Sequence, residues 1–91
     1  MVLTKNENIY ETMLDENKYI VYDENKGLVH EINNVAYYVL GLCNGTKTFE
    51  DIVDEVIKEY AGVKREVVEP DIKLVISQFK QLGILNETAA K

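Results

Sequence analysis

The feature that most constrains the fold of this chain is a change of hydrophobic period near Asn33. Before it, short runs rich in β-branched and aromatic residues cover positions 9–14, 18–22 and 28–32, with turn-forming residues at 15–17 and 23–27 between them. After it, apolar residues recur every three or four positions, which is the spacing of one face of a helix. The chain therefore predicts a meander of three short antiparallel strands followed by helices.

Capping residues mark the first two expected helices. The first covers roughly residues 35–43, with Asn33 or Asn34 as its cap. The second opens at Thr48, whose spacing to Asp51 is that of a capping box with Asp in place of the usual Glu or Gln. Its apolar stripe comprises Phe49, Ile52, Val53, Val56, Ile57 and Tyr60.

The third expected helix begins near Pro70, a residue suited to a first helical turn, or one turn earlier, and Gly83 closes it. Leu74 lies about 200° around this helix from Ile72, which places it outside the core-facing stripe. That stripe is Ile72, Val75, Ile76, Phe79 and Leu82. Another face is shared by Lys73, Ser77 and Lys80. The order of elements predicts one α+β domain over residues 1–91, with its core at about 8–86.

Charge limits the partners that such a domain can bind. The 91 residues hold 16 acidic and 10 basic side chains, for a net charge of −6, and Arg65 is the single arginine. Affinity for nucleic acid rests on Lys and Arg neutralising phosphates, so DNA and anionic membranes are poor candidates. The N-terminus lacks the apolar stretch of a signal peptide, and the longest apolar run, 35–43, is about half a membrane span. With one cysteine, Cys43, the chain fits a reducing cytoplasm.

Few side chains could carry chemistry. His30 is the only histidine and Cys43 the only cysteine. A general base needs an orienting partner and a metal needs three or four ligands, and no such set stands at ligand spacing. We therefore expect His30 to be an ordinary strand residue, Cys43 to be a buried structural residue, and neither a metal nor a cofactor to be bound. A solvated helix face accounts for the carboxylates of Glu50, Asp51, Asp54 and Glu55.

Several motifs occur in an order and spacing that resemble the PqqD family over roughly residues 8–86. They are Ile32-Asn33-Asn34-Val35-Ala36, the stretch from Leu42 to Ile52 with its Asn44-Gly45-Thr46 turn, Tyr60 and Val67, Asp71-Ile72, and Leu82-Gly83-Ile84-Leu85. The resemblance implies a winged-helix-like fold. It also implies a non-catalytic role as a precursor-peptide recognition element, which holds the leader of a ribosomally made peptide while a partner enzyme modifies the core. Partners of this family are often radical S-adenosylmethionine enzymes, or proteases and cyclases of lasso-peptide pathways.

In this family the leader adds as an extra strand to the third strand of the meander, in a cleft against the third helix. The residues of that strand include no Pro or Lys that would protect its edge. The resemblance implies leader contacts at Leu28, Val29, His30, Glu31 and Ile32, and along the helix at Lys73, Leu74, Ser77 and Lys80.

Two other classes of function are weighed against this one. A winged-helix DNA-binding regulator shares the topology, but it needs a basic recognition helix, and residues 70–83 offer only Lys73 and Lys80 against Asp71. A small enzyme would need a constellation of catalytic groups that the sequence does not contain.

Overall fold

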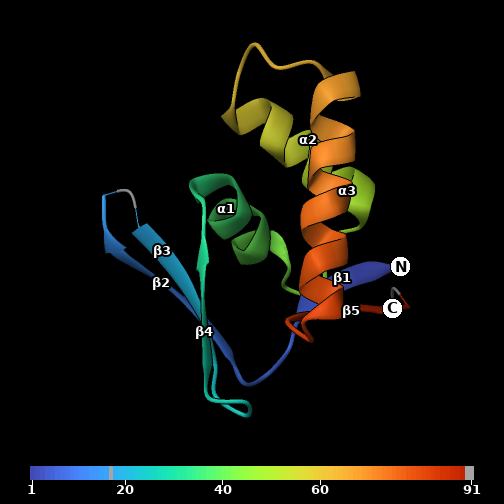
Figure 1. Ribbon diagram of the computed structural model, residues 1–91. Helices are drawn as coiled ribbons and strands as arrows, with labels where there is room; N and C mark the ends of the chain where they lie inside the picture. Colours follow the sequence, from blue (N-terminus) through green and yellow to red (C-terminus); the bar gives the residue numbers. More distant parts are fainter. Residues whose placement is uncertain (17, 90–91) are drawn as a thin grey trace.

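The computed structural model describes residues 1–16 and 18–89 and has an α+β fold (Figure 1). The predicted meander followed by three helices is confirmed. Asn17, in the first predicted turn, and residues 90–91 lie outside the described residues. In chain order the elements are β1 (Val2–Lys5), β2 (Ile9–Asp15), β3 (Lys18–Asp23), β4 (Leu28–Ile32), α1 (Asn34–Leu42), α2 (Phe49–Glu59), α3 (Arg65–Gln81) and β5 (Leu85–Thr88).

The meander forms a three-stranded antiparallel sheet of order β2-β3-β4. Val21 in the central strand lies opposite Glu11 of β2 and His30 of β4. Side chains alternate between the two faces of a strand, and accordingly Val21 is fully buried whereas Tyr22 is exposed. One face of the sheet therefore packs toward α1, the other faces solvent, and β2 and β4 are the two edges.

A second, two-stranded sheet joins β1 and β5, which the sequence did not predict. Val2 is paired with Thr88 and Lys5 with Leu85, so the two ends of the chain lie side by side (Figure 1). On its other side, β1 is hydrogen-bonded to the loop between α1 and α2, where Leu3 N–H donates to Lys47 at 2.9 Å. A four-residue strand whose partner is at the far end of the chain leaves no local periodic signal, which is why sequence patterns missed it.

The caps of α1 and α2 match their predictions. Asn33, rather than Asn34, caps α1, because its side-chain oxygen accepts a hydrogen bond from Ala36 N–H at 2.8 Å. Thr48 and Asp51 form the reciprocal capping box of α2. Each of these interactions satisfies backbone N–H groups that a helix start leaves without an intrahelical partner.

α3 begins at Arg65, so the earlier of the two predicted starts, about one turn before Pro70, is the one that the structure has. Pro70 lies inside the helix and has no N–H to donate to the carbonyl of Glu66. The first turn is instead held by Arg65, whose guanidinium contacts Glu50 and Asp54 of α2 at 2.7 Å each and Glu69 at 3.3 Å. Tertiary ion pairs thus extend the helix ahead of its proline.

Gly83 ends α3 as predicted, with a φ of 78° that side chains beyond glycine rarely adopt. Ile84 N–H donates to the Phe79 carbonyl at 2.8 Å and Gly83 N–H to the Lys80 carbonyl at 3.1 Å, the pattern of a Schellman motif. This motif turns the chain from α3 into β5.

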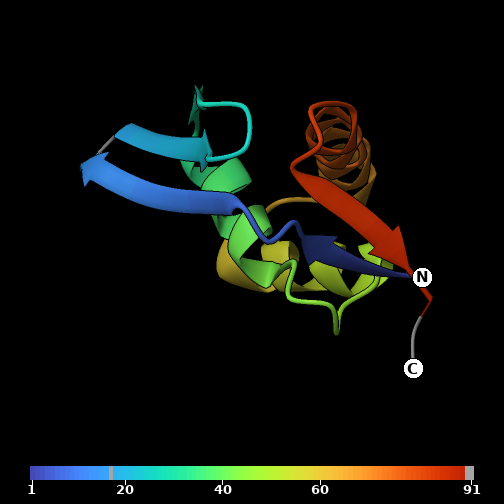
Figure 2. The same ribbon diagram turned by 90° about the horizontal axis from the view of Figure 1, so that it is seen from below.

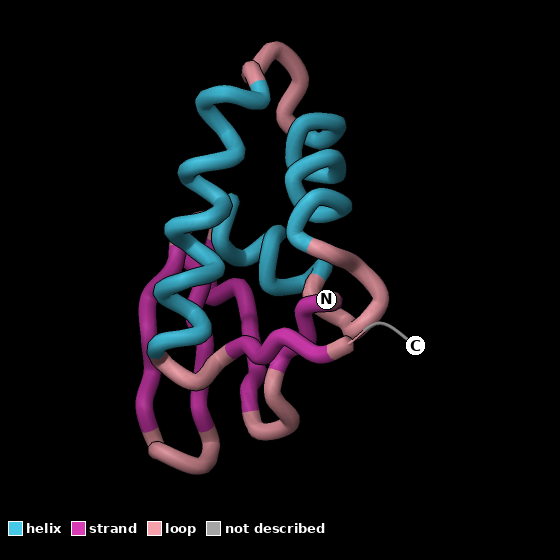
Figure 3. The backbone as a smooth tube through the Cα atoms, turned by 90° about the vertical axis from the view of Figure 1, so that its right-hand side faces the viewer, coloured by secondary structure: helices cyan, strands magenta, loops and turns pink. Residues whose placement is uncertain are grey.

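The core lies between the helices and the two sheets, and Cys43 is part of it, as predicted for a structural cysteine. The Cα trace spans 37 × 36 × 18 Å, so the domain is thin and offers surface sites rather than deep ones. Figure 3 shows the α2–α3 loop at one end of the molecule and the β3–β4 turn at the other. Among the described residues, no helix combines the length and the apolar character needed to cross a bilayer.

Candidate functional site

The exposed edge of β4 is the first component of the candidate site. β4 is hydrogen-bonded to β3 on one side only, and Val29 is 58 % exposed on it. Because side chains alternate, Leu28, His30 and Ile32 share the core-side face with Val21, whereas Val29 and Glu31 point to the other face. An edge strand without a neighbour carries backbone N–H and C=O groups that another extended chain can pair with.

The second component is α3, which faces β4 across the front of the molecule. Figures 1 and 2 both show β4 and α3 on the same side, with α1 behind and between them. Over the described residues, β4 and α3 are not among the elements that pack closely against each other, whereas α3 packs on α2 and β5. The candidate site is the free edge of β4 together with the side of α3 toward it, and the stretch between these two elements is called the interval.

One direct contact near this interval links the β3–β4 turn to the end of α3. Lys26 Nζ donates a hydrogen bond to the Leu82 carbonyl at 3.0 Å. The turn itself is braced by the buried Asp23, whose carboxylate accepts from Lys26 N–H at 3.1 Å and whose carbonyl accepts from Gly27 N–H at 2.8 Å. Lys26 therefore bridges the β3–β4 turn and the end of α3 on this side of the interval.

The structure does not bring the predicted helix residues together beside β4. Lys73, Ser77 and Lys80 line a hollow of about 380 Å³ that also includes Leu3 of β1, Phe49 of α2 and Glu87 of β5. Lys80 is additionally ion-paired with Glu87. In Figure 1, β1, β5 and the start of α2 lie on the side of α3 away from β4. These three residues are therefore on the flank of α3 opposite the β4 edge.

The flank of α3 toward β4 follows from helical geometry. Residues are spaced by about 100° around a helix, so Asp71, Val75, Gln78 and Leu82 lie on the side of the buried stripe opposite Lys73 and Lys80. Leu82 was predicted as core but is 40 % exposed, because it caps the helix beside the Lys26 contact. Leu74 is 59 % exposed, as expected for a residue outside the stripe, and it lies at the outer rim of this flank.

The side chains considered for catalysis are placed apart from one another. Cys43 is 2 % exposed, its thiol donates to the Val39 carbonyl at 3.2 Å, and burial raises its pKa to about 12. His30 is half-buried on β4. Of the helix carboxylates, Glu50 and Asp54 are engaged by Arg65 and Asp51 by the α2 cap. No group of three or more His, Cys, Asp or Glu side chains stands at metal-binding geometry within residues 1–16 and 18–89.

Comparison with known families identifies this arrangement. The family model of coenzyme PQQ synthesis protein D, PqqD, matches residues 18–85, which is most of the chain and runs from the start of β3 to the start of β5. The chain belongs to the PqqD family. The resemblance drawn from the sequence motifs is thereby confirmed. No curated protein sequence matches the chain.

Two solved structures share the fold of this PqqD-family domain. TbiB1 in complex with the TbiA(beta) leader peptide superposes with a TM-score of 0.77 at 20% identity, covering 94% of this chain and 98% of TbiB1. A lasso peptide synthetase B1 complexed with its leader peptide has the same TM-score at 17% identity, covering 96% of this chain and 100% of the synthetase chain. At these identities the likeness establishes the fold.

Two parts of the candidate site were missed by sequence reasoning. Lys26 lies in a turn and gave no signal of its contact with Leu82, because hydrogen bonds between distant segments have no sequence period. Leu82 did carry a signal, since it stands one residue before the glycine that closes α3, and caps are commonly less buried than helix interiors. Leu82 was predicted to be buried because it also fits the apolar spacing of the core stripe.

Proposed function

We propose that this domain binds the leader segment of a ribosomally made precursor peptide by adding it as an extended strand to β4. The observation that carries the proposal is the open edge of β4, with α3 facing it across the interval that Lys26 spans at one end. Membership of the PqqD family and the leader peptides bound to both structural neighbours support it.

Strand addition assigns separate roles to the backbone and the side chains of a leader. Backbone hydrogen bonds to residues 28–32 supply affinity that tolerates sequence variation, and alternate leader side chains supply selectivity. Side chains on the core side of the added strand enter the interval and meet Val75, Gln78 and Leu82, with Leu74 at the rim. Lys73, Ser77 and Lys80 contact only a leader long enough to continue around α3.

In this proposal the domain makes and breaks no covalent bond. Its nucleophile candidate, Cys43, is a protonated buried thiol, and His30 has no oriented acidic partner among the hydrogen bonds of the described residues. The domain instead raises the local concentration of the precursor core beside a separate enzyme. A lasso-peptide protease or cyclase is the favoured partner because of the structural neighbours, and a radical S-adenosylmethionine enzyme is the other class expected of the family.

The DNA-binding alternative is disfavoured by the charges of α3. Its basic residues are Arg65, Lys73 and Lys80, and two of these are already paired with carboxylates, Arg65 with Glu50 and Asp54 and Lys80 with Glu87. A recognition helix needs free cations toward the phosphates.

Calorimetry with the leader of the precursor encoded beside this chain tests the proposal, with a scrambled leader as control. We expect saturable 1:1 binding of the native leader, and amide chemical-shift changes in residues 28–32. Mass spectrometry of a leader–core peptide should show modification only when the enzyme is added. Binding equal for both leaders, shift changes confined to other elements, or a mass change caused by this domain alone would each contradict the proposal.

A further inference from the structure

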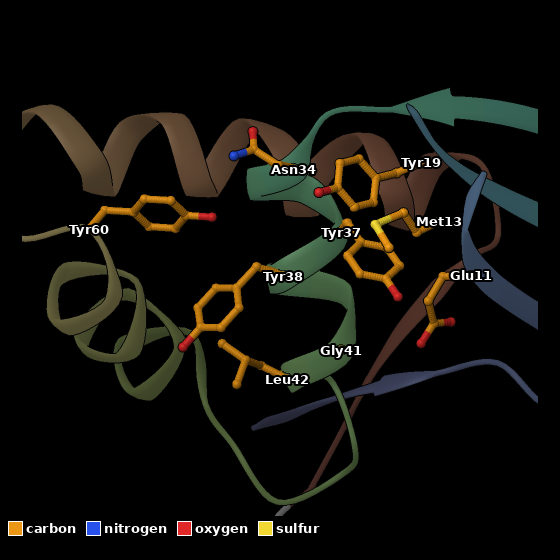
Figure 4. A pocket seen from close by; sticks show the side chains of 9 residues that line it. All are labelled: Glu11, Met13, Tyr19, Asn34, Tyr37, Tyr38, Gly41, Leu42 and Tyr60. Carbon is orange, nitrogen blue, oxygen red and sulfur yellow. The ribbon is translucent and has the colours of Figure 1, made fainter. Parts of the chain in front are cut away.

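A tyrosine-lined hollow lies on the opposite side of α1 from the β4–α3 interval. It has a volume of about 530 Å³ and is formed by the core-side face of β2 and β3, the outward face of α1 and the end of α2 (Figure 4). Four of the six tyrosines of the chain line it: Tyr19, Tyr37, Tyr38 and Tyr60. The hollow is distinct from the proposed leader site, which uses the other edge of the sheet.

The four rings are arranged as two pairs. Tyr19 and Tyr37 have centroids 4.6 Å apart with a tilt of 35°, and Tyr38 and Tyr60 meet edge to face at 6.0 Å. Figure 4 shows the pairs side by side along α1, where Tyr37 and Tyr38 are adjacent. None of the four is fully buried, so ring surface is available to a bound group. Electron-rich ring faces attract cations.

Acidic side chains outnumber basic ones around the hollow, because Lys5 pairs with Glu11 and Lys58 with Glu55, whereas Glu59 has no ion pair among the described residues. Glu11 is the one charged residue of the lining, and its carboxylate lies 2.6 Å from Lys5 Nζ. At the other end, Glu55 and Glu59 of α2 lie close enough to act on Tyr38. Burial raises the pKa of the Tyr38 hydroxyl, and the negative charges of Glu59 and then Glu55 raise it further. No Lys or Arg lines the hollow in the part of the chain that the structure describes.

We propose that this hollow receives an arginine side chain from a basic segment of a partner protein. A guanidinium is planar, stacks on aromatic rings and pairs with carboxylates, so it matches both the tyrosine walls and the acidic rim. A second copy of this chain does not fit, because it carries a net charge of −6 and its single arginine, Arg65, is bound by Glu50, Asp54 and Glu69. The site thus gives the domain a docking surface that leaves β4 free.

In the test, protein with isotope-labelled tyrosines is titrated with acetyl-Gly-Arg-Gly-amide, and the tyrosine ring signals are followed by NMR. The peptide in which citrulline replaces arginine is the matched control, since it keeps the shape and removes the charge. We expect saturable shifts of the four hollow tyrosines, with Tyr10 and Tyr22 unmoved because both are exposed on the other face of the sheet. Affinity for the citrulline peptide should be about two- to fivefold weaker, as should the affinity of Glu59→Gln protein for the arginine peptide.

Tyr38→Leu should abolish the saturable shifts, whereas Tyr22→Leu should leave them unchanged. Equal affinity for the two peptides, uniform shifts of all six tyrosines, or no saturable shift in a folded protein would overturn the inference. Leader binding to β4 is measured in the same samples. Because the two sites lie on opposite sides of α1, loss of one with retention of the other identifies which proposal fails.

Discussion

Lys26 Nζ donates a hydrogen bond to the carbonyl oxygen of Leu82 at 3.0 Å, joining the β3–β4 turn to the last turn of α3. This contact bridges the two elements that we propose to bind the leader. It also satisfies one of the carbonyl groups that a helix end leaves without an intrahelical partner. The affinity for the leader should therefore depend on a residue that need not touch the peptide.

The first prediction concerns this contact. Lys26→Met should weaken leader binding a few-fold while stability changes by less than about 1 kcal/mol, because the lost hydrogen bond is exposed. Calorimetry and thermal unfolding measure the two effects. Lys64→Met, which removes an exposed lysine before the other end of α3, is the charge-matched control. Equal loss of affinity in both variants would mean that net charge, rather than spacing, controls binding.

Proline placed along β4 should have effects that alternate with position. Along an edge strand, the backbone N–H groups of every second residue bond to the neighbouring strand, and those of the residues between them point outward. Val29 and Glu31 therefore differ from His30 in the direction of their N–H groups. Proline at outward positions should weaken leader binding and leave the fold intact, and proline at bonded positions should lower the stability. We expect Val29→Pro and Glu31→Pro to be the folded, weakly binding variants. If folded variants with proline at either set of positions both bound the leader with native affinity, strand addition at β4 would be excluded.

The two flanks of α3 should respond differently to substitution. Leu82→Ala should weaken leader binding roughly fivefold, the effect of removing a half-exposed apolar contact of about 1 kcal/mol. Leu74→Ala at the rim should have a smaller effect. Lys73→Glu on the opposite flank should stay within about twofold unless the leader continues around the helix. Measurements with truncated leaders show whether the leader continues around the helix, since only the binding of a long leader can depend on Lys73.

The stability of the α2–α3 pair should depend on salt through Arg65. Arg65→Lys keeps the charge but loses the planar fork that reaches Glu50 and Asp54 together, so the melting temperature should fall. Raising the ionic strength should narrow the difference from the native protein, because the ion pairs are exposed. A salt-independent difference would show that packing of the arginine stem is the main contribution.

Stability should also fall at alkaline pH because of Cys43. Burial raises the pKa of this thiol from 9.0 to about 12, so between these values the unfolded chain loses a proton that the folded chain keeps. Unfolding is therefore favoured as the pH rises above 9.0. Cys43→Ala should show a weaker pH dependence of its stability over the same range, because it lacks the thiol. Iodoacetamide at pH 8 should modify the native thiol far more slowly than the unfolded one.

Local patterns were sufficient for most elements of the fold. Alternation and turn residues placed β2, β3 and β4, and N-terminal capping residues placed α1 and α2. The sequence left the start of α3 open between Pro70 and the turn before it, because the ion pairs of Arg65 with α2 are tertiary and leave no signal in the local sequence. The edge strand of the candidate site could be predicted, since an edge follows from the order of strands. The flank of α3 that faces it could not, because helical periodicity says which residues are exposed but not what they face.

The pairing of β1 with β5 bears on how the chain acquires its structure. Val2 and Thr88 can pair only after the 85 residues between them have been synthesised, and contacts between such distant positions are slow to form. Until then, the buried side chains of Val2 and Leu3 have no strand to cover them. We therefore expect the meander and α1 to assemble before the two-stranded sheet, whose closure completes the core around Leu85.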